Sequence, residues 1–366
     1  MSQLFSPIAI GPHTLPNRIA IAPMCQYSAN DGSATDWHMM HLGTLAASGA
    51  ALLVLEATAV ERRGRISHGC LGLYSDDNEL ALQRVVAACR RYGTARLGVQ
   101  LAHAGRKGSS HVPWQGGGPL EPEHDAWQTL APEADDGGRG GPAPHAATQA
   151  DLDRVREAFV QAARRAERLG LEVIEVHCAH GYLMHEFLSA LSNRRTDGYG
   201  GDLAGRMRFP LEVFEAVRAA VGPQVAVGAR ITGSDWLEGG IDEREAGLFA
   251  AELEKRGCAY VDVTSGGLLP ASIPVGPGYQ VPLAAAVKRA VQGMPVRAVG
   301  MIVAPAQAEA IIAEGHADMV ALARAMLDNP HWPYEAARQL QGSVEYPPQY
   351  QRAQPAAWPG AALKQG

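Results

Sequence analysis

Short hydrophobic runs alternate along the chain with longer stretches in which apolar residues recur every three or four positions. The runs ALLVLEAT and VAVGARI are almost continuously apolar, which is typical of strands buried on both faces of a parallel sheet. The pattern therefore predicts eight strands, at Arg18–Met24, Ala51–Thr58, Arg96–Ala102, Leu171–His177, Val225–Ile231, Tyr260–Thr264, Val296–Val299 and Met319–Ala323.

The longer stretches have the spacing of amphipathic helices. Asp151–Leu169 begins with an acidic cap and places apolar residues three and four positions apart, and Glu243–Arg256 repeats this spacing. Pro282–Gln292 and Pro305–Glu314 both start on proline, which the first turn of a helix accommodates. Helices of this kind between successive strands are typical of βαβ units.

The alternation of strands and helices through 366 residues predicts a single α/β domain, a closed (β/α)₈ TIM barrel. The alternative is a doubly wound sheet. Such a sheet would carry a G-x-G-x-x-G turn after its first strand, where this chain has Pro23, Met24 and Cys25.

Two regions interrupt the alternation. Residues 105–150, after the third strand, are rich in Gly, Pro, His and Asp and are too long for an ordinary connection, so we expect an excursion over the barrel mouth. The barrel is expected to span residues 1–342. Residues 343–366 form a tail with Arg352 and Trp358, whose aromatic residues leave docking onto a neighbouring subunit open.

Composition and charge exclude several classes of protein. The formal net charge of -6 is spread along the chain, with no basic stripe for nucleic acid and no acidic tract. The five cysteines are scattered without a C-x-x-C pair, which fits neither a disulfide framework nor a structural zinc or iron–sulfur site. The chain has no apolar run of about 20 residues for a membrane span and no signal-peptide pattern. We therefore expect a cytoplasmic protein.

The most informative chemistry follows the fourth predicted strand. Reactive groups in TIM barrels gather at the carboxyl ends of the strands, and here the sequence runs from His177 through Cys178 and His180 to Tyr182. Two imidazoles and a phenol can hold a carbonyl or nitro oxygen and then protonate carbon. The pair of histidines, with Cys178 between them, also fits a metal site, although no carboxylate follows before Glu186. An ordinary structural role is the third interpretation.

Other strand ends suggest a phosphorylated, heteroaromatic cofactor. Gly300 and Arg324 suit a phosphate group, although a tight turn and a surface ion pair explain them equally well. Arg230 and Gln100 suit the pyrimidine edge of a flavin. A Schiff-base aldolase would need a lysine at a strand end, and Lys107 alone comes near one.

These residues occur within longer motifs that resemble the old yellow enzymes, in particular the thermophilic-like branch with the bacterial xenobiotic reductases. The motifs are APMCQYSANDG, DWHMMHLG, EATAV, QLAHAGRK, HGYL, NRRTDGYGG and GPGYQVP. The resemblance extends over essentially the whole chain, from LFSPIAIGPH to ARAMLDNPHWPYEAARQL.

The resemblance implies non-covalent FMN, reduced by NADPH or NADH, and hydride transfer from flavin N5 to the β-carbon of an α,β-unsaturated carbonyl or nitro compound. It implies that Tyr182 gives the proton and that His177, His180 and Tyr27 bind the substrate oxygen. It implies a cofactor site made of Ala22, Pro23, Met24, Cys25, Ala57, Gln100, Arg230, Gly300, Met301, Ala323 and Arg324.

The resemblance also implies a homodimer or homotetramer, in which Arg352 or Trp358 enters a neighbouring active site. Lys107 is expected at the rim of the site, and Cys178 is an unusual residue between the paired histidines, expected to serve packing alone. Two alternatives remain. A dienoyl-CoA-reductase-like flavoenzyme would carry a cysteine-rich iron–sulfur segment and a second nucleotide domain. A flavin-based redox sensor is permitted by the free cysteines, but no effector domain supports it.

Overall fold

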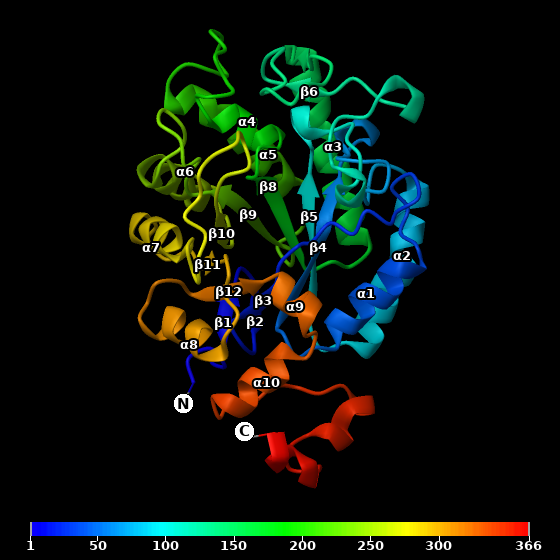
Figure 1. The fold of residues 1–366 in the computed structure, drawn as a ribbon, viewed down its shortest axis with the longest axis vertical. Helices are drawn as coiled ribbons and strands as arrows, with labels where there is room; N and C mark the ends of the chain where they lie inside the picture. Colours follow the sequence, from blue (N-terminus) through cyan, green and yellow to red (C-terminus); the bar gives the residue numbers. More distant parts are fainter. Residues whose placement is uncertain (1, 365–366) are drawn as a thin grey trace.

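The computed structural model describes residues 2–364. Within these residues, eight parallel strands close into a barrel, with helices between successive strands (Figure 1). The prediction of a (β/α)₈ barrel is confirmed, and the open, doubly wound alternative is wrong because the last strand pairs with the first. The barrel strands are β3 (Ile19–Ile21), β4 (Leu52–Ala59), β5 (Arg96–Ala102), β8 (Val173–Cys178), β9 (Ala226–Thr232), β10 (Val261–Thr264), β11 (Val296–Ala298) and β12 (Met319–Leu322).

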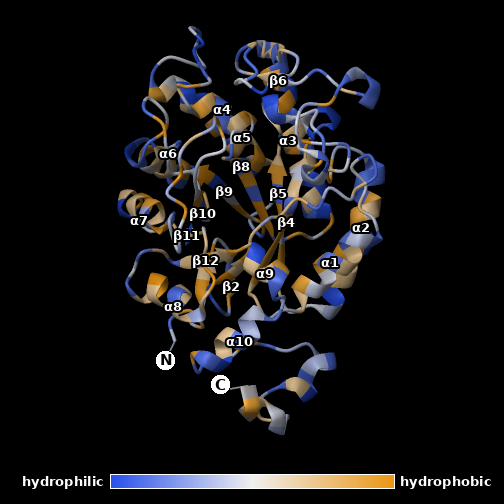
Figure 2. Ribbon diagram, in the orientation of Figure 1, coloured by the Kyte–Doolittle hydropathy of each residue, from blue (hydrophilic) through white to orange (hydrophobic). Residues whose placement is uncertain are grey.

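Helices surround the barrel and turn their apolar faces to it (Figure 2). In α3 (Gln149–Arg168), Thr148 and Asp151 form a capping box, and Val155 and Phe159 are buried against the barrel. This cap satisfies backbone N–H groups that a helix start leaves unpaired. The other long helices are α1 (Asp36–Ala46), α2 (Asp76–Tyr92), α5 (Leu203–Ala220), α6 (Glu243–Lys255), α7 (Val281–Ala290) and α8 (Pro305–Ala313).

A hairpin of β1 (Ile8–Ile10) and β2 (His13–Leu15) precedes the barrel. Its buried residues Ile10 and Leu15 pack with Leu52, Val173 and Met319, which begin their barrel strands. The hairpin therefore closes the amino-terminal end of the barrel, and the carboxyl ends of the strands remain available for chemistry.

The predicted excursion contains only short elements: η2 (Gly105–Lys107), η3 (Pro113–Gln115), η4 (Pro122–His124), β6 (Leu130–Ala131) and β7 (His145–Ala146). It is anchored to the barrel by polar contacts. The Trp127 indole N–H donates to the Arg63 carbonyl oxygen at 2.9 Å, and His145 Nε2 lies 2.9 Å from Asp151 Oδ2.

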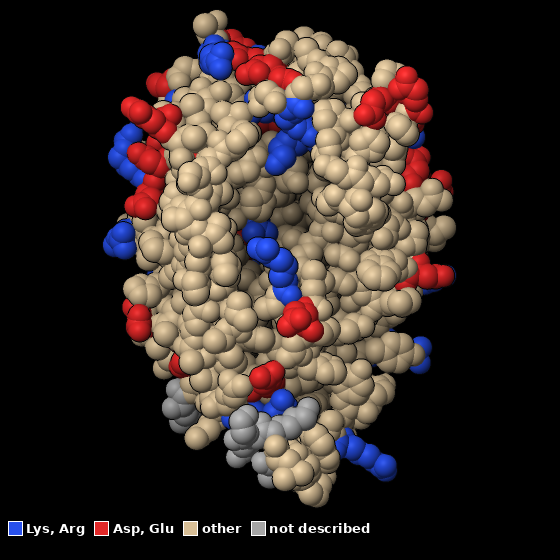
Figure 3. Space-filling view, in the orientation of Figure 1, with Lys and Arg blue, Asp and Glu red and all other residues tan. Residues whose placement is uncertain are grey.

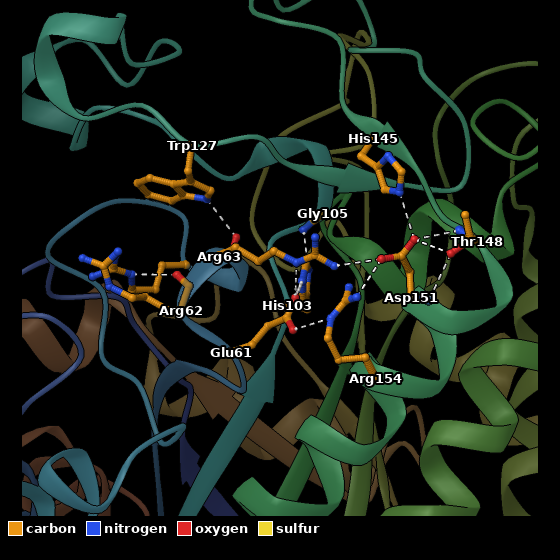
Figure 4. A network of polar contacts seen from close by, with 11 residues as sticks. Glu61, Arg62, Arg63, His103, Gly105, Trp127, His145, Thr148, Asp151 and Arg154 are labelled. Atoms are coloured by element: carbon orange, nitrogen blue, oxygen red, sulfur yellow. Dashed lines mark hydrogen bonds and ion pairs between the residues drawn. The ribbon is translucent and has the colours of Figure 1, made fainter.

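The network around Glu61 joins these anchors (Figure 4). Its carboxylate lies 2.9 Å from His103 Nε2, 2.6 Å from Arg63 Nε and 3.4 Å from Arg154 Nε. These contacts connect the ends of β4 and β5 to α3. The segments to which the excursion is anchored are therefore joined to one another through the Glu61 carboxylate.

The tail follows α9 (Arg324–Asp328) and α10 (Trp332–Gln339) and forms two short turns, η5 (Pro348–Ala353) and η6 (Pro359–Lys364). The rings of Tyr346 and Tyr334 stack at 4.1 Å between centroids, which docks the start of the tail onto α10. Figure 1 shows the tail at the opposite end of the molecule from β6. Within residues 2–364, no helix combines the length and apolar character that crossing a membrane requires.

Candidate active site

A cavity of about 460 Å³ opens at the carboxyl ends of the barrel strands, a volume within the range of small-molecule sites. Figure 3 shows a hollow in the centre of one face, with Lys and Arg side chains at its edge. The cavity brings together predicted residues from five of the strand ends: Ala22, His180, Arg230, Gly300, Met301, Ala323 and Arg324.

One end of the cavity combines a glycine, whose backbone a ligand can approach closely, with a positive charge that has no ion-pair partner among the described residues. Gly300 has a φ of +105°, and a Cβ there would come within 2.5 Å of Gln280 Nε2, so glycine is required. Arg324 is exposed at the cavity, and among residues 2–364 no carboxylate forms an ion pair with it. The interpretation of Arg324 as a surface ion pair is therefore wrong. The unpaired Arg324 guanidinium, beside the accessible backbone of Gly300, fits a phosphate group.

Arg230 and Gln100 both have partners inside the barrel. Arg230 Nε lies 3.2 Å from Asp262 Oδ1, and Gln100 Nε2 donates to Glu175 Oε1 at 2.8 Å. Arg230 also lines the cavity, whereas Gln100 is only 2% exposed. The sequence argument that Arg230 needs an anion near the barrel axis holds, and the protein itself supplies that anion.

His177, His180 and Tyr182 lie together, as predicted. The centroid of the His177 ring lies 5.3 Å from that of His180 and 5.0 Å from that of Tyr182, and both pairs meet edge to face. His180 has a φ of +60° and is followed by Gly181 at +71°, so a left-handed turn brings the second imidazole back beside the first. The geometry makes one compact group of two imidazoles and one phenol.

The electrostatics of this group favour neutral forms. Burial lowers the pKa of His177 and of His180 well below the usual range, and the positive charge of Arg230 lowers both further. Burial raises the pKa of the Tyr182 phenol well above its usual value. At neutral pH each imidazole therefore carries a single N–H, and Tyr182 keeps its proton.

Cys178 points away from this group. It is fully buried in the hydrophobic core, because successive residues of a strand face opposite sides of the sheet. Burial also raises the pKa of its thiol. Cys178 therefore cannot join His177 and His180 around one metal ion.

Lys107 supports the turn from outside. Its ammonium group donates to the His180 carbonyl oxygen at 2.7 Å and to the Gly267 carbonyl oxygen at 2.9 Å, and it lies 5.0 Å from the centre of the Tyr182 ring. Burial lowers the pKa of Lys107 to about 8. The position agrees with the expectation that Lys107 lies at the rim of the site.

A second, fully buried pair fixes the same turn from inside. His185 Nε2 lies 2.9 Å from Asp235 Oδ1, while His185 Nδ1 accepts the Gly181 N–H at 2.8 Å. Both side chains are inaccessible to solvent. Since Nδ1 is an acceptor, the imidazole proton is on Nε2, the atom that lies next to the Asp235 carboxylate. The sequence analysis did not identify this pair.

The remaining predicted residues border the main cavity less directly. Pro23, Met24, Cys25 and Tyr27 follow β3 and are half-buried, and burial raises the pKa of the Cys25 thiol. Ala57 does not line the main cavity. It lines a smaller one with Tyr182. The ring of Tyr27 meets that of Trp114 edge to face at 5.9 Å, which joins the excursion to this end of the barrel.

The sequence analysis also missed Thr264 and Gln280, which line the cavity. Gln280 Oε1 accepts from Thr264 Oγ1 at 3.1 Å and from Ser265 Oγ at 2.6 Å, and His180 Nε2 lies 3.0 Å from Thr264 Oγ1. Gln280 precedes α7 instead of ending a strand. The motif GPGYQVP, which contains it, was the available signal.

A profile of the NADH:flavin oxidoreductase / NADH oxidase family matches residues 3–342. The chain belongs to this family. It is 42% identical to an NADPH dehydrogenase of Geobacillus thermodenitrificans (strain NG80-2) over 351 aligned residues. The alignment covers 95% of this chain and 98% of that relative.

Two solved structures of reductases have similar folds. Morphinone reductase aligns with a TM-score of 0.77 at 29% identity, over 95% of this chain and 92% of that one. A complex of 2-naphthoyl-CoA reductase aligns with a TM-score of 0.83 at 25% identity, over 92% of this chain but only 52% of that one. This chain thus spans about half the length of the CoA-ester reductase.

Membership of the NADH:flavin oxidoreductase family confirms the resemblance to the old yellow enzymes. The protein is an oxidoreductase that uses FMN, with NADH or NADPH as the hydride donor. The residues at the cavity fit that cofactor: Gly300 leaves room for close approach, and the Arg324 guanidinium has no ion-pair partner among the described side chains.

Proposed function

We propose that this protein is an FMN-dependent ene-reductase for activated alkenes, namely α,β-unsaturated carbonyl or nitro compounds. When bound, FMN would supply the hydride chemistry of this reaction, with hydride taken from NADPH or NADH and passed from N5 to the substrate β-carbon. Support comes from the grouping of two neutral imidazoles and a protonated phenol at the end of β8, beside a cavity of cofactor size.

The cofactor would be held at three places. Gly300, Met301, Ala323 and Arg324 would surround its phosphate group, with Arg324 as the cation. Arg230 and Gln100 would face the pyrimidine edge, where positive charge stabilises a reduced, anionic ring. Ala22, Pro23, Met24, Cys25 and Ala57 would contact the ring system from the ends of β3 and β4.

His177 and His180 would each donate a hydrogen bond to the substrate oxygen. Hydride addition at the β-carbon develops negative charge on this oxygen, so donors placed there favour the transition state over the ground state. Tyr27, which follows β3, would add a hydroxyl to the same oxygen. The lowered pKa values of His177 and His180 keep both imidazoles neutral near pH 7, so each can donate its single N–H to the substrate oxygen without taking up a further proton.

Tyr182 would give the proton to the α-carbon. Its raised pKa keeps the phenol protonated until a strongly basic carbon is formed.

The relatives named NADPH dehydrogenase favour NADPH as the donor. The subunits would form a homodimer or homotetramer, with Arg352 or Trp358 of the tail at a neighbouring site. The structured turns η5 and η6 are compatible with such docking.

The double variant His177→Ala/His180→Ala tests the assignment. We expect it to retain FMN and reduction of FMN by NADPH, but to lose cyclohexenone reduction by about 100-fold or more. His316→Ala is the matched control, because it removes an exposed histidine that has a single carboxylate neighbour. Unchanged cyclohexenone turnover in the double variant would refute the assignment of the oxygen-binding pair.

A further inference from the structure

The excursion contains a cluster of metal-binding side chains, none of which belongs to the proposed flavin or substrate site. His111, Glu121 and His124 place one donor atom each within 4.8 Å of one another, in the one such group found among the described residues. Both imidazoles approach the same carboxylate oxygen: His111 Nε2 lies 2.8 Å and His124 Nδ1 lies 3.1 Å from Glu121 Oε2. We propose that these three residues bind Zn²⁺.

The backbone brings the three donors together without a metal. The His111 N–H donates to the Gly118 carbonyl oxygen at 2.8 Å, and the Leu120 N–H donates to the Ser109 carbonyl oxygen at 2.7 Å. These bonds close a hairpin that places His111 beside Glu121. Glu121 and His124 are three residues apart: Glu121 immediately precedes the turn η4, and His124 is its last residue. The ligands are therefore preorganised, which reduces the entropy lost on binding.

The donor set matches the chemistry of zinc. Two imidazole nitrogens and one carboxylate oxygen are common protein ligands of Zn²⁺, and water completes the tetrahedron in open sites. Glu121 and His124 are more than half exposed, so water reaches the remaining position. Ligands about 2.0–2.2 Å from a tetrahedral zinc ion lie roughly 3.3–3.6 Å apart. Each imidazole nitrogen therefore needs to move only about half an ångström away from Glu121 Oε2.

The zinc site would stabilise a segment that contacts the proposed substrate-binding residue Tyr27. The hairpin between His111 and Glu121 carries Trp114, whose ring meets that of Tyr27 edge to face at 5.9 Å. A metal ion that bridges the two ends of this segment restrains it as a short crosslink does. The binding proposal itself stands apart from the proposed reaction, because it depends only on residues of the excursion.

Calorimetric titration of the metal-free holoenzyme with Zn²⁺ tests the proposal. We expect one equivalent to bind in the wild type, and His111→Ala and His124→Ala each to weaken that binding by at least about tenfold. His316→Ala is the matched control and should bind as the wild type does, since His316 has Glu314 as a neighbour but no second histidine. Glu121→Gln keeps an oxygen acceptor for both imidazoles but removes the charge, so it too should weaken binding.

Zinc that binds equally well to the His111→Ala and His124→Ala variants would occupy another site, and the proposal would be wrong. It would also be wrong if the wild type showed no saturable binding below about 1 mM Zn²⁺. Hydrogen exchange provides a second readout. Zinc should slow amide exchange in residues 110–125 of the wild type and leave it unchanged in His124→Ala. Because the His124 side chain is exposed, its removal should not unfold the segment, so a lost zinc effect in this variant reports lost binding.

Discussion

At the scale of single residues, Tyr182 carries the proposed proton transfer, and its buried phenol stays protonated at neutral pH. Tyr182→Phe keeps the ring against His177 and removes the acidic proton. We therefore expect the oxidative half-reaction with cyclohexenone to slow by about 10²–10⁴-fold, while reduction of FMN by NADPH is unchanged. Stopped-flow absorbance of the flavin separates the two half-reactions. Slower flavin reduction would instead make Tyr182 a nicotinamide contact.

His180 has a competing acceptor in the free protein. Thr264 Oγ1 donates its proton to Gln280 Oε1, so it accepts from His180 Nε2–H at 3.0 Å. In the proposed binding mode, a substrate oxygen would have to displace this bond. Thr264→Val removes the competitor, and we expect the KM for cyclohexenone to fall about 2–10-fold, the worth of one hydrogen bond. Thr264→Ser retains the hydroxyl and should leave KM unchanged. A higher KM in Thr264→Val would mean that Thr264 orients His180 for binding.

At the scale of elements, the excursion depends on the carboxylate of Glu61. Burial alone would raise its pKa, but hydrogen bonds from His103 and Arg63 lower the pKa to about 2, from an ordinary 4.5. A carboxylate with a lowered pKa contributes stability above its unfolded pKa, and this contribution is lost as the pH falls toward about 2. A shift of this size is worth roughly 3 kcal/mol.

Glu61→Gln should therefore lower the melting temperature at pH 7, and the difference from the wild type should shrink steadily between about pH 4.5 and pH 2. Glu314→Gln, at a residue whose side chain is 63% exposed, is the matched control and should change the melting temperature little at any pH. A difference between Glu61→Gln and wild type that stays constant down to pH 2 would show that packing, not charge, causes the loss.

The barrel elements could be predicted from sequence because strands buried on both faces are apolar along their whole length. The predicted strand Val225–Ile231 corresponds to β9 (Ala226–Thr232). The limits of Arg18–Met24 were less accurate, because the ladder of β3 ends at Ile21 and the chain then turns over the barrel end. The position of residues at strand ends followed from the same pattern, while the roles proposed for them rest on the family motifs.

Contacts between distant segments could not be predicted. The partner of Arg230 is Asp262 on the neighbouring strand, and this pairing depends on the register between β9 and β10. His185 and Asp235 are 50 residues apart and meet only after α4 (Leu183–Leu188) has packed. One sequence gives the periodicity of each element but not the register that brings such side chains together.

At the scale of the whole molecule, one buried arginine connects the strands that carry the proposed flavin contacts. Arg297 on β11 is fully buried and pairs with Glu175 on β8 and with Asp262 on β10. Glu175 accepts from Gln100 on β5, and Asp262 pairs with Arg230 on β9. Two positive and two negative charges balance inside the barrel, so each depends on the others.

Removal of Arg297 should therefore affect both stability and FMN binding. Arg297→Met leaves the two buried carboxylates of Glu175 and Asp262 with one remaining cation, Arg230, which pairs with Asp262 alone. We therefore expect the free energy of unfolding to fall by about 3–5 kcal/mol. We also expect weaker FMN binding, because the excess negative charge lies behind Gln100 and Arg230. Urea unfolding and fluorescence titration of the apoprotein with FMN measure the two effects.

The double variant Arg297→Met/Glu175→Gln tests whether charge is the cause. It removes one charge of each sign. The oxygen of the introduced amide can still accept from Gln100, and its NH2 group can donate to the hydroxyl oxygen of Tyr260, which lies 2.9 Å from Glu175 Oε2. If charge balance holds the barrel interior together, the double variant should be more stable than Arg297→Met and should bind FMN more tightly. If the second substitution adds to the damage instead, the loss in Arg297→Met comes from packing around the missing guanidinium, and Gln100 and Arg230 are positioned by their own strands.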